Sequence, residues 1–306
     1  MVAKADWVWM DGELVPWDEA NVHILTHTLH YGVGAFEGIR AYRQEDGRSA
    51  VFRLREHVRR LFESTRLMLM PMPYTPAEVE AAILETLRSN DLKDAYIRPL
   101  AFIGTGRMGL YAFDNPTRVA ITVWNWGAYL GDEGLNKGIR ATVSSYTRHF
   151  PNSTLAKGKI CGHYVNSVLA KREAMLNGFD EAIMMDHEGA VSEATGENIF
   201  VVRDGIVKTP GFSSAILGGI TRDSIIRMAR DQGIEVQEGR VARDELYIAD
   251  EVFMTGTAAE VTPVREIDHR TVGNGEPGPI TRALQERFFG VVKGKMGGYE
   301  EWLTYV

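Results

Sequence analysis

A glycine-rich segment, Gly127–Gly138, separates two parts of the chain that each mix short strands with helices. Its glycines and polar residues lie between two apolar runs, a pattern typical of an interdomain linker. The length of 306 residues also exceeds what one hydrophobic core usually supports. The sequence therefore predicts an α/β (α+β) protein of two domains, residues 1–126 and 139–306, joined by the linker 127–138.

The N-terminal part predicts two amphipathic helices. Thr75 and Glu78 have the spacing of a capping box with Pro76 at the first helical position, so a helix is expected from there to about Ser89. A second helix is expected at 55–70, ending before two prolines. Strands are expected at 95–103 and 118–125.

The C-terminal part has its strongest local signal at Asp204-Gly205, a dipeptide that favours a tight hairpin between strands 198–203 and 206–209. Apolar periodicity and glycine stops predict the other elements. Helices are expected at 162–177, 221–232 and 280–292, and strands at 181–186 and 251–255.

Composition excludes several classes of protein. The net charge is -7 without a basic run, which argues against a nucleic-acid partner. Cys161 is the single cysteine, so an internal disulfide framework is excluded and a cytoplasmic location fits. No apolar stretch reaches the ~18 residues of a membrane span, and the start lacks the apolar core of an export signal, so no membrane association is expected.

Two local patterns resemble known sites without their required context. Gly104–Gly109 matches G-x-G-x-x-G, but a dinucleotide site needs a helix there, and the following residues predict a glycine loop. His23, His27 and His30 share a helical face without accompanying carboxylates, which favours packing over a metal site. No metal is therefore expected, and Cys161 is expected to be a small buried thiol.

Two of the nine lysines stand apart from the others. Lys157 and Lys159 lie among small residues next to an expected helix, where partial burial lowers an amine pKa and favours Schiff-base chemistry. The residues alone do not choose between the two lysines. Two turns of small residues, 217–222 and 255–259, present backbone N–H groups suited to binding a phosphate.

Five segments together carry a resemblance to a known family. They are Tyr31-Gly-Val-Gly-Ala-Phe-Glu-Gly-Ile-Arg40, Tyr96-Ile-Arg-Pro99, Ser192-Glu-Ala-Thr-Gly-Glu-Asn198, Gly219-Ile-Thr-Arg222 and Thr255-Gly-Thr-Ala-Ala-Glu-Val-Thr-Pro263. With these segments the chain resembles the branched-chain amino-acid aminotransferases, which are fold-type IV pyridoxal-phosphate enzymes, over nearly its full length. The resemblance implies a two-domain fold with the cofactor, pyridoxal 5'-phosphate, in the cleft between the domains.

The resemblance also assigns roles to the cofactor-binding residues. It implies that Lys159, rather than Lys157, binds the cofactor covalently and then moves a proton between the substrate Cα and the cofactor. Glu193 accepts the pyridinium N–H and Tyr164 hydrogen-bonds the ring phenolate. The residues expected to hold the phosphate are Arg60, Ile220, Thr221 and Thr257.

The same resemblance implies the substrate site. Apolar and aromatic walls suit a branched side chain, with Tyr31 reaching in from a neighbouring subunit. Arg98, with Tyr31 and Tyr129, is expected to bind the distal carboxylate of glutamate. The full set of expected substrate-binding residues is Tyr31, Phe36, Tyr96, Arg98, Tyr129, Thr257 and Ala258, with Tyr164 beside them.

The reaction that follows is a reversible ping-pong transamination of L-leucine, L-isoleucine and L-valine with 2-oxoglutarate, in a homo-oligomer of two or more subunits. Three alternatives stay open: a fold-type IV transaminase for D-amino acids or primary amines, an aminodeoxychorismate lyase, and a non-catalytic pyridoxal-phosphate-binding protein. The intact set of Lys159, Tyr164 and Glu193 argues against the last of these.

Overall fold

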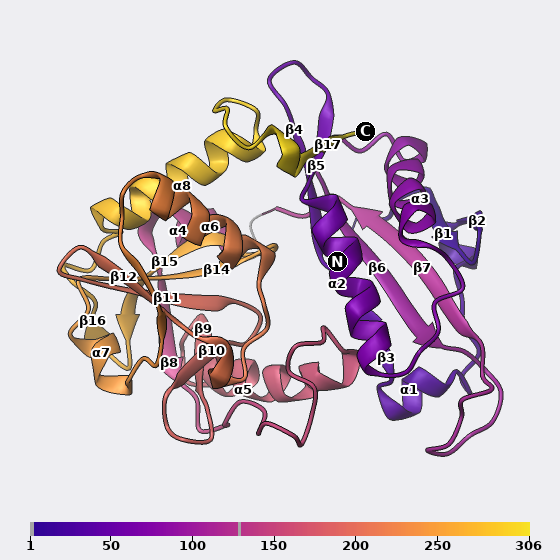
Figure 1. Cartoon of the computed structure of the whole chain (residues 1–306), viewed down its shortest axis with the longest axis horizontal. Helices are drawn as coiled ribbons and strands as arrows, with labels where there is room; N and C mark the ends of the chain where they lie inside the picture. The colour runs from indigo at the N-terminus through magenta and orange to yellow at the C-terminus, as the bar shows by residue number, and fades with distance from the viewer. Residues whose placement is uncertain (1–2, 128–129) are drawn as a thin grey trace. The chain divides into compact units, whose positions relative to one another are not determined.

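The computed structural model describes residues 3–127 and 130–306, which form two compact units (Figure 1). The first unit comprises the chain up to Trp126 together with Gly158–His163 and Val291–Val306. The second comprises Gly127–Lys157 and Tyr164–Gly290. The chain therefore crosses from one unit to the other at 126/127, 157/158, 163/164 and 290/291.

The first unit is built on a mixed set of short and long strands with two main helices. Its elements are β1 (Trp7–Met10), β2 (Glu13–Pro16), η1 (Trp17–Glu19), α1 (His27–Tyr31), β3 (Gly34–Phe36), β4 (Ile39–Arg43), β5 (Ser49–Phe52), α2 (Leu54–Leu67), α3 (Pro76–Ser89), β6 (Ala95–Ile103), β7 (Thr117–Trp124), η2 (Cys161–His163), η4 (Glu300–Trp302) and β17 (Leu303–Tyr305).

The strands of this unit form one antiparallel sheet in the order β17-β5-β4-β6-β7-β1-β2, with β3 paired to β6. Helices α2 and α3 pack against one face of it (Figure 1). Leu61 of α2, Ile83 of α3 and Ile97 of β6 meet in the core between them, and all three are fully buried. Alternate residues of β6 point to the opposite face, which carries Tyr96, Arg98, Leu100 and Phe102.

The second unit contains more strands, three of whose pairings are parallel. Its elements are α4 (Gly131–Lys137), β8 (Ile139–Val143), α5 (Tyr164–Leu176), β9 (Glu181–Met185), β10 (Val191–Ala194), β11 (Asn198–Arg203), β12 (Ile206–Pro210), η3 (Phe212–Ser214), α6 (Ile220–Asp231), β13 (Val236–Gly239), α7 (Arg243–Tyr247), β14 (Glu251–Gly256), β15 (Glu260–Ile267), β16 (Arg270–Thr271) and α8 (Pro279–Val292), whose last two residues belong to the first unit.

The sheet of the second unit runs β10-β9-β8-β15-β14-β11-β12-β13, with β16 on β15. The parallel pairs are β8 with β9, β8 with β15, and β12 with β13. Both faces of the sheet are covered: Ala182 and Met184 of β9 pack with α5, whereas Ile183 between them joins the core on the other face. Burial on both sides explains why β9 is apolar without alternation.

Most predicted elements are confirmed, including the capping box at Thr75 and Glu78, where Glu78 N–H donates to Thr75 Oγ1 and the Glu78 carboxylate accepts from Thr75 N–H. The helix expected at 55–70 ends earlier, at Leu67, because Leu69 adopts a left-handed backbone with φ 56°. The segment 127–138, expected to be a linker, contains α4 and belongs to the second unit. In the described residues, no helix is both long and apolar enough to cross a membrane.

Candidate functional site

The segment Gly158–His163 brings Lys159 into the first unit. Its backbone is bound on both sides: Lys159 N–H donates to Ser64 Oγ at 2.9 Å, and Lys159 C=O accepts from Phe36 N–H at 3.1 Å. A further bridge pairs Ile160 with Ala35 of β3. The Lys159 ammonium nitrogen lies 5.0 Å from the centroid of the Phe36 ring. Hydrogen bonds therefore fix the backbone of Lys159, and its side chain lies beside an aromatic ring.

Lys157 has a different environment, although it lies only two residues away. It belongs to the second unit, and its Nζ donates to the carbonyl oxygens of Phe212 at 2.7 Å and Ile216 at 3.3 Å. Partial burial lowers the pKa of Lys157. These carbonyl contacts give Lys157 a structural use and separate it from Lys159, a distinction that the sequence pattern alone did not provide.

An aromatic cluster surrounds Arg98 on one face of the first sheet. Tyr96 and Arg98 lie two residues apart on β6, so their side chains share a face. Arg98 donates to the Tyr96 hydroxyl at 3.2 Å, and its guanidinium carbon lies 4.7 Å from the Phe36 ring centroid. Trp124 and Trp126 pack against Tyr96, with ring centroids 5.0 and 4.7 Å away. A cation inside aromatic walls suits a carboxylate at the end of an otherwise apolar ligand.

Tyr31 lies at the end of α1 and is 40% exposed. Its hydroxyl accepts a hydrogen bond from Gly109 N–H at 3.1 Å, and its ring stands 4.5 Å from the ring of His27. His27 also contacts Gly109, through Nε2 and the carbonyl oxygen at 2.8 Å. The G-x-G-x-x-G stretch thus forms a loop with no helix after it, as expected from its sequence, and it positions the Tyr31 phenol.

Glu193 of β10 is a buried carboxylate that accepts four hydrogen bonds from residues of the second unit. It is 4% exposed, and its Oε1 accepts from Arg148 Nε at 2.9 Å and Nη2 at 2.8 Å. Its Oε2 accepts from Leu217 N–H at 3.0 Å and from Asn198 Nδ2 at 3.2 Å. Four donors of this kind hold the carboxylate in one orientation.

Asn198 connects the start of α6 with Glu193, because its side chain contacts both Glu193 and Gly219. The helix begins at Ile220 with Thr221 buried behind it, and its N-cap is Gly219, which has no side chain to cap the helix. A Cβ at Gly219 would lie 1.9 Å from Asn198 Oδ1, so only glycine fits there. A helix start whose N-cap residue provides no side-chain cap is suited to binding an anion.

Thr257 and Ala258 lie in the turn that follows β14 in the same unit. Thr255, the β14 residue paired with Asn198, is 1% exposed, and its Oγ1 is buried without a hydrogen-bond partner among the described residues. A buried hydroxyl of this kind is expected where a polar ligand completes the site. The turn, the α6 start and Glu193 are therefore connected through one residue, Asn198.

The other expected residues are placed as follows. Arg60 of α2 lies in the first unit, where its guanidinium is bonded to the Glu37 carboxylate. Tyr164 is the first residue of α5 in the second unit, and Tyr129 lies outside the described residues. Burial raises the pKa of the Cys161 thiol to about 11, which fits an unreactive thiol. No group of three or more metal-ligating side chains occurs within 3–127 and 130–306.

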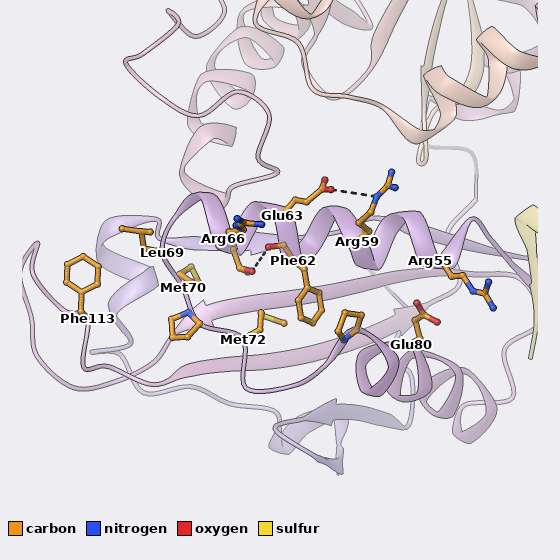
Figure 2. Close-up of a pocket in the computed structure, with 13 residues that line it drawn as sticks. Arg55, Arg59, Phe62, Glu63, Arg66, Leu69, Met70, Met72, Glu80 and Phe113 are labelled. Atoms are coloured by element: carbon orange, nitrogen blue, oxygen red, sulfur yellow. Dashed lines mark hydrogen bonds and ion pairs between the residues drawn. The ribbon is translucent and has the colours of Figure 1, made fainter.

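A groove of about 920 Å³ lies elsewhere on the first unit, between α2 and the chain before α3 (Figure 2). Phe62 and Met72 form its apolar floor, and the exposed pair of Arg59 and Glu63, 3.7 Å apart, lies on α2 beside it. None of the expected site residues that the structure describes lines this groove. The candidate site is instead defined by the polar clusters described above.

Sequence reasoning missed several residues that the structure adds to these clusters. They are Glu37, His57, Trp124, Trp126, Arg148 and Asn198. Trp124 and Trp126 could have been found as aromatic residues two apart at a strand end. Arg148 and His57 carry no such signal, because their partners lie far away in the sequence.

Comparisons with known proteins all match this chain to aminotransferases. The profile of the family described as amino-transferase class IV matches residues 34–267. The branched-chain-amino-acid aminotransferase of Pseudomonas aeruginosa is 50% identical over 299 residues, which cover 98% of this chain and 97% of that protein. The enzyme of the same name from Escherichia coli K12 is 46% identical over 308 residues, covering 99% and 98%.

Solved structures agree with this assignment. The crystal structure of the Escherichia coli branched-chain amino acid aminotransferase matches with a TM-score of 0.96 at 46% identity, covering 98% of this chain and 99% of that one. The branched-chain amino acid aminotransferase from Thermobaculum terrenum, solved in its PLP-form, matches with a TM-score of 0.91 at 38% identity, covering 98% of both. Near-complete coverage in sequence and in fold means that the chain belongs to the class IV aminotransferase family, and within it to the branched-chain-amino-acid aminotransferases.

Proposed function

We infer that the chain is a pyridoxal-phosphate-dependent transaminase that transfers the amino group of L-leucine, L-isoleucine and L-valine to 2-oxoglutarate, giving branched-chain 2-oxo acids and L-glutamate. The observation that carries this inference is the 50% identity over nearly the full length to a branched-chain-amino-acid aminotransferase. The sequence resemblance to this family is thereby confirmed. The reaction is reversible and proceeds by a ping-pong order of substrates.

The residues of the second unit fit the cofactor. Glu193 offers a carboxylate, held in place by Arg148, that can accept a pyridinium N–H. The start of α6 has glycine as its N-cap, because a Cβ there would lie 1.9 Å from Asn198 Oδ1, and a helix start without a side-chain cap suits an anion. The buried hydroxyl of Thr255 has no partner among the described residues. A flat, anionic ring compound with one protonated nitrogen and a phosphate answers all three requirements.

Lys159 supplies the amine. When bound, pyridoxal phosphate provides an electron sink for the bond that breaks at the substrate Cα. Lys159 would hold the cofactor in the resting enzyme, and its ε-amine would carry the proton to and from the substrate Cα. Its backbone contacts with Ser64 and Phe36 keep the base of the side chain fixed during these movements. Tyr164 would hydrogen-bond the ring oxygen.

Substrate recognition rests on the aromatic cluster of the first unit. Phe36 and Tyr96, with the neighbouring Trp126, provide apolar walls for a branched side chain, and Arg98 provides a cation for the distal carboxylate of glutamate. Tyr129 would belong to the same pocket, and Tyr31 would add a hydroxyl from a neighbouring subunit. Backbone N–H groups of Thr257 and Ala258 would bind the α-carboxylate.

A homo-oligomer of two or more subunits is part of this proposal. Apolar side chains near Tyr31 are strongly exposed within the single chain: Leu29 is 60%, Leu110 is 92% and Phe113 is 58% exposed. Apolar surface exposed to this extent normally marks an interface between proteins. We place the enzyme in the cytoplasm, in keeping with its single cysteine.

The visible spectrum of the purified protein tests the function directly. A cofactor absorption band should be present in the unmutated protein and be lost in Lys159→Ala. It should be retained in Lys157→Ala, because Nζ of Lys157 is hydrogen-bonded to carbonyl oxygens of the second unit. L-leucine should convert the band to that of the pyridoxamine form, with stoichiometric release of the 2-oxo acid. Conversion by D-alanine or a primary amine in its place would overturn the substrate assignment.

A further inference from the structure

The carboxylate of Glu37 is fully buried and accepts three hydrogen bonds from α2. Its Oε1 lies 2.7 Å from Arg60 Nε, and its Oε2 lies 2.9 Å from Arg60 Nη2 and 2.7 Å from His57 Nδ1. His57 and Arg60 are three residues apart and therefore project from the same face of the helix. Glu37 N–H is fixed in turn by the carbonyl oxygen of Pro99 at 2.9 Å.

The charges in this cluster are well defined. Arg60 and His57 hold the pKa of Glu37 well below its usual range, against the effect of burial. Burial, with the nearby charges of Arg60 and Lys159, lowers the pKa of His57, so the imidazole is neutral near pH 7. An ionised carboxylate only accepts hydrogen bonds, so Nδ1 of His57 must carry the proton. The cluster is one anion, one cation and one neutral donor.

The same turn of α2 also supports Lys159. Ser64 Oγ donates to the backbone carbonyl of Arg60 at 2.7 Å and accepts from Lys159 N–H at 2.9 Å. The side chain of Arg60 is thus fixed by Glu37, and its backbone is joined through Ser64 to the segment that carries Lys159. The Arg60 side chain and the Lys159 backbone are therefore both held by the same part of the first unit.

A buried ion pair is a weak source of stability, because desolvation offsets most of the attraction, and apolar residues of similar size would stabilise the fold as well. A bidentate pair does, however, fix the plane of the guanidinium. Glu37 engages two of the five N–H donors of Arg60, along one edge. Because the guanidinium is planar and rigid, the direction of its other N–H donors is then fixed as well.

We propose that Glu37, supported by His57, is a positioning residue that orients the Arg60 guanidinium toward the phosphate of the cofactor. The proposal rests on the proposed function, since it takes pyridoxal phosphate as the ligand. Glu37 touches neither the cofactor nor the substrate in this proposal and acts through Arg60. Substituting Glu37 should therefore change the affinity only for a ligand that carries the phosphate group.

The test compares binding of pyridoxal phosphate with binding of pyridoxal, which lacks the phosphate, to the cofactor-free protein by absorption titration. Glu37→Gln keeps the size of the side chain, removes its charge and places an amide beside the guanidinium. We expect Glu37→Gln to weaken pyridoxal phosphate about tenfold or more and to leave pyridoxal within about twofold. Equal weakening of both compounds, or no weakening of either, would overturn the proposal.

A double-mutant cycle with Arg60→Met shows whether Glu37 acts through Arg60. Arg60→Met should itself remove most of the preference for the phosphorylated compound, and Glu37→Gln added to it should change that preference no further. Additive effects on the preference would contradict the proposal. Glu63→Gln is the matched control, since Glu63 pairs with Arg59 on the exposed side of the same helix and should leave both affinities unchanged.

His57 provides a second readout in case Glu37→Gln does not fold. His57→Asn retains a donor at the position of Nδ1, whereas His57→Leu removes it. We expect His57→Leu to weaken pyridoxal phosphate selectively and His57→Asn to restore most of the affinity; identical behaviour of the two variants would overturn the role of His57. If the unmutated protein does not prefer pyridoxal phosphate over pyridoxal, the proposed function fails. If Arg60→Met removes the preference and Glu37→Gln does not, the positioning role fails while the function stands.

Discussion

Arg148 binds a single oxygen of Glu193 with two of its nitrogens, Nε at 2.9 Å and Nη2 at 2.8 Å. Its third nitrogen, Nη1, donates to Ser167 Oγ at 2.9 Å on α5. The other oxygen of Glu193 is bonded to the second unit's backbone at Leu217. The carboxylate that would accept the pyridinium proton is therefore held from both sides by its own unit.

Arg148→Met should leave Glu193 buried without a counter-charge. Removing one partner of a buried pair costs about 3–5 kcal/mol, so a large loss in the free energy of unfolding is expected. Urea unfolding measures it, and the amino-transfer rate with L-leucine should fall by at least about tenfold. In the background of Glu193→Gln the same substitution should have little further effect on the rate; a full additional loss there would contradict a role through Glu193.

Gly38→Ala should disturb the recognition of glutamate more than that of leucine. A Cβ at Gly38 would lie 1.9 Å from the Tyr96 hydroxyl, so Tyr96 must move, which disturbs its hydrogen bond with Arg98. We expect kcat/KM for glutamate to fall about tenfold, with a smaller fall for leucine. Gly239→Ala, with no described atom within 4 Å, is the control. Equal losses with both substrates would refute the specific role of Arg98.

Gly109→Ala should weaken the use of 2-oxoglutarate through Tyr31. Gly109 has φ +99°, a conformation that costs a residue with a side chain about 1–3 kcal/mol, and its N–H donates to the Tyr31 hydroxyl. A rise in KM for 2-oxoglutarate is expected, matched by Tyr31→Phe. Gly47→Ala carries a similar strain at φ +82°, also with no described atom within 4 Å, in the loop between β4 and β5. It should leave this KM unchanged.

Glu197 makes the stability of the second unit depend on pH. Burial, with the charge of Glu181 nearby, raises the pKa of Glu197 to about 8. The folded chain then holds a proton that the unfolded chain has released between about pH 4.5 and 8, so stability falls as pH rises through that range. Glu197→Gln removes this dependence.

Urea unfolding of the unmutated protein and of Glu197→Gln at several pH values measures the effect. The variant should gain on the unmutated protein as pH rises, reaching on the order of 3–5 kcal/mol above pH 8. Thr195 Oγ1 donates to Glu181 at 2.6 Å, so the neighbouring carboxylate keeps a hydrogen-bond donor in the variant. A constant difference between the two proteins across this range would show that Glu197 is ionised in the folded state.

Local patterns made much of the fold predictable. The capping box at Thr75 and the hairpin at Asp204-Gly205 depend on neighbouring residues only, and the structure confirms both. The site was harder, because its partners are distant in sequence: Arg148 and Glu193 are 45 residues apart, and Glu37 and Arg60 are 23 apart. A single lysine or arginine in a sequence carries no sign of the carboxylate that will meet it. The catalytic and binding roles of these residues stay predictions.

Strand β17, at Leu303–Tyr305, pairs antiparallel with β5 at Ser49–Phe52 and completes one edge of the first unit's sheet. A ribosome makes β17 only after the whole second unit has been translated. Until β17 has been made, the nascent first unit therefore has an unpaired edge at β5 that can pair with other chains. Chains stalled or truncated before residue 303 would be expected to aggregate through this edge.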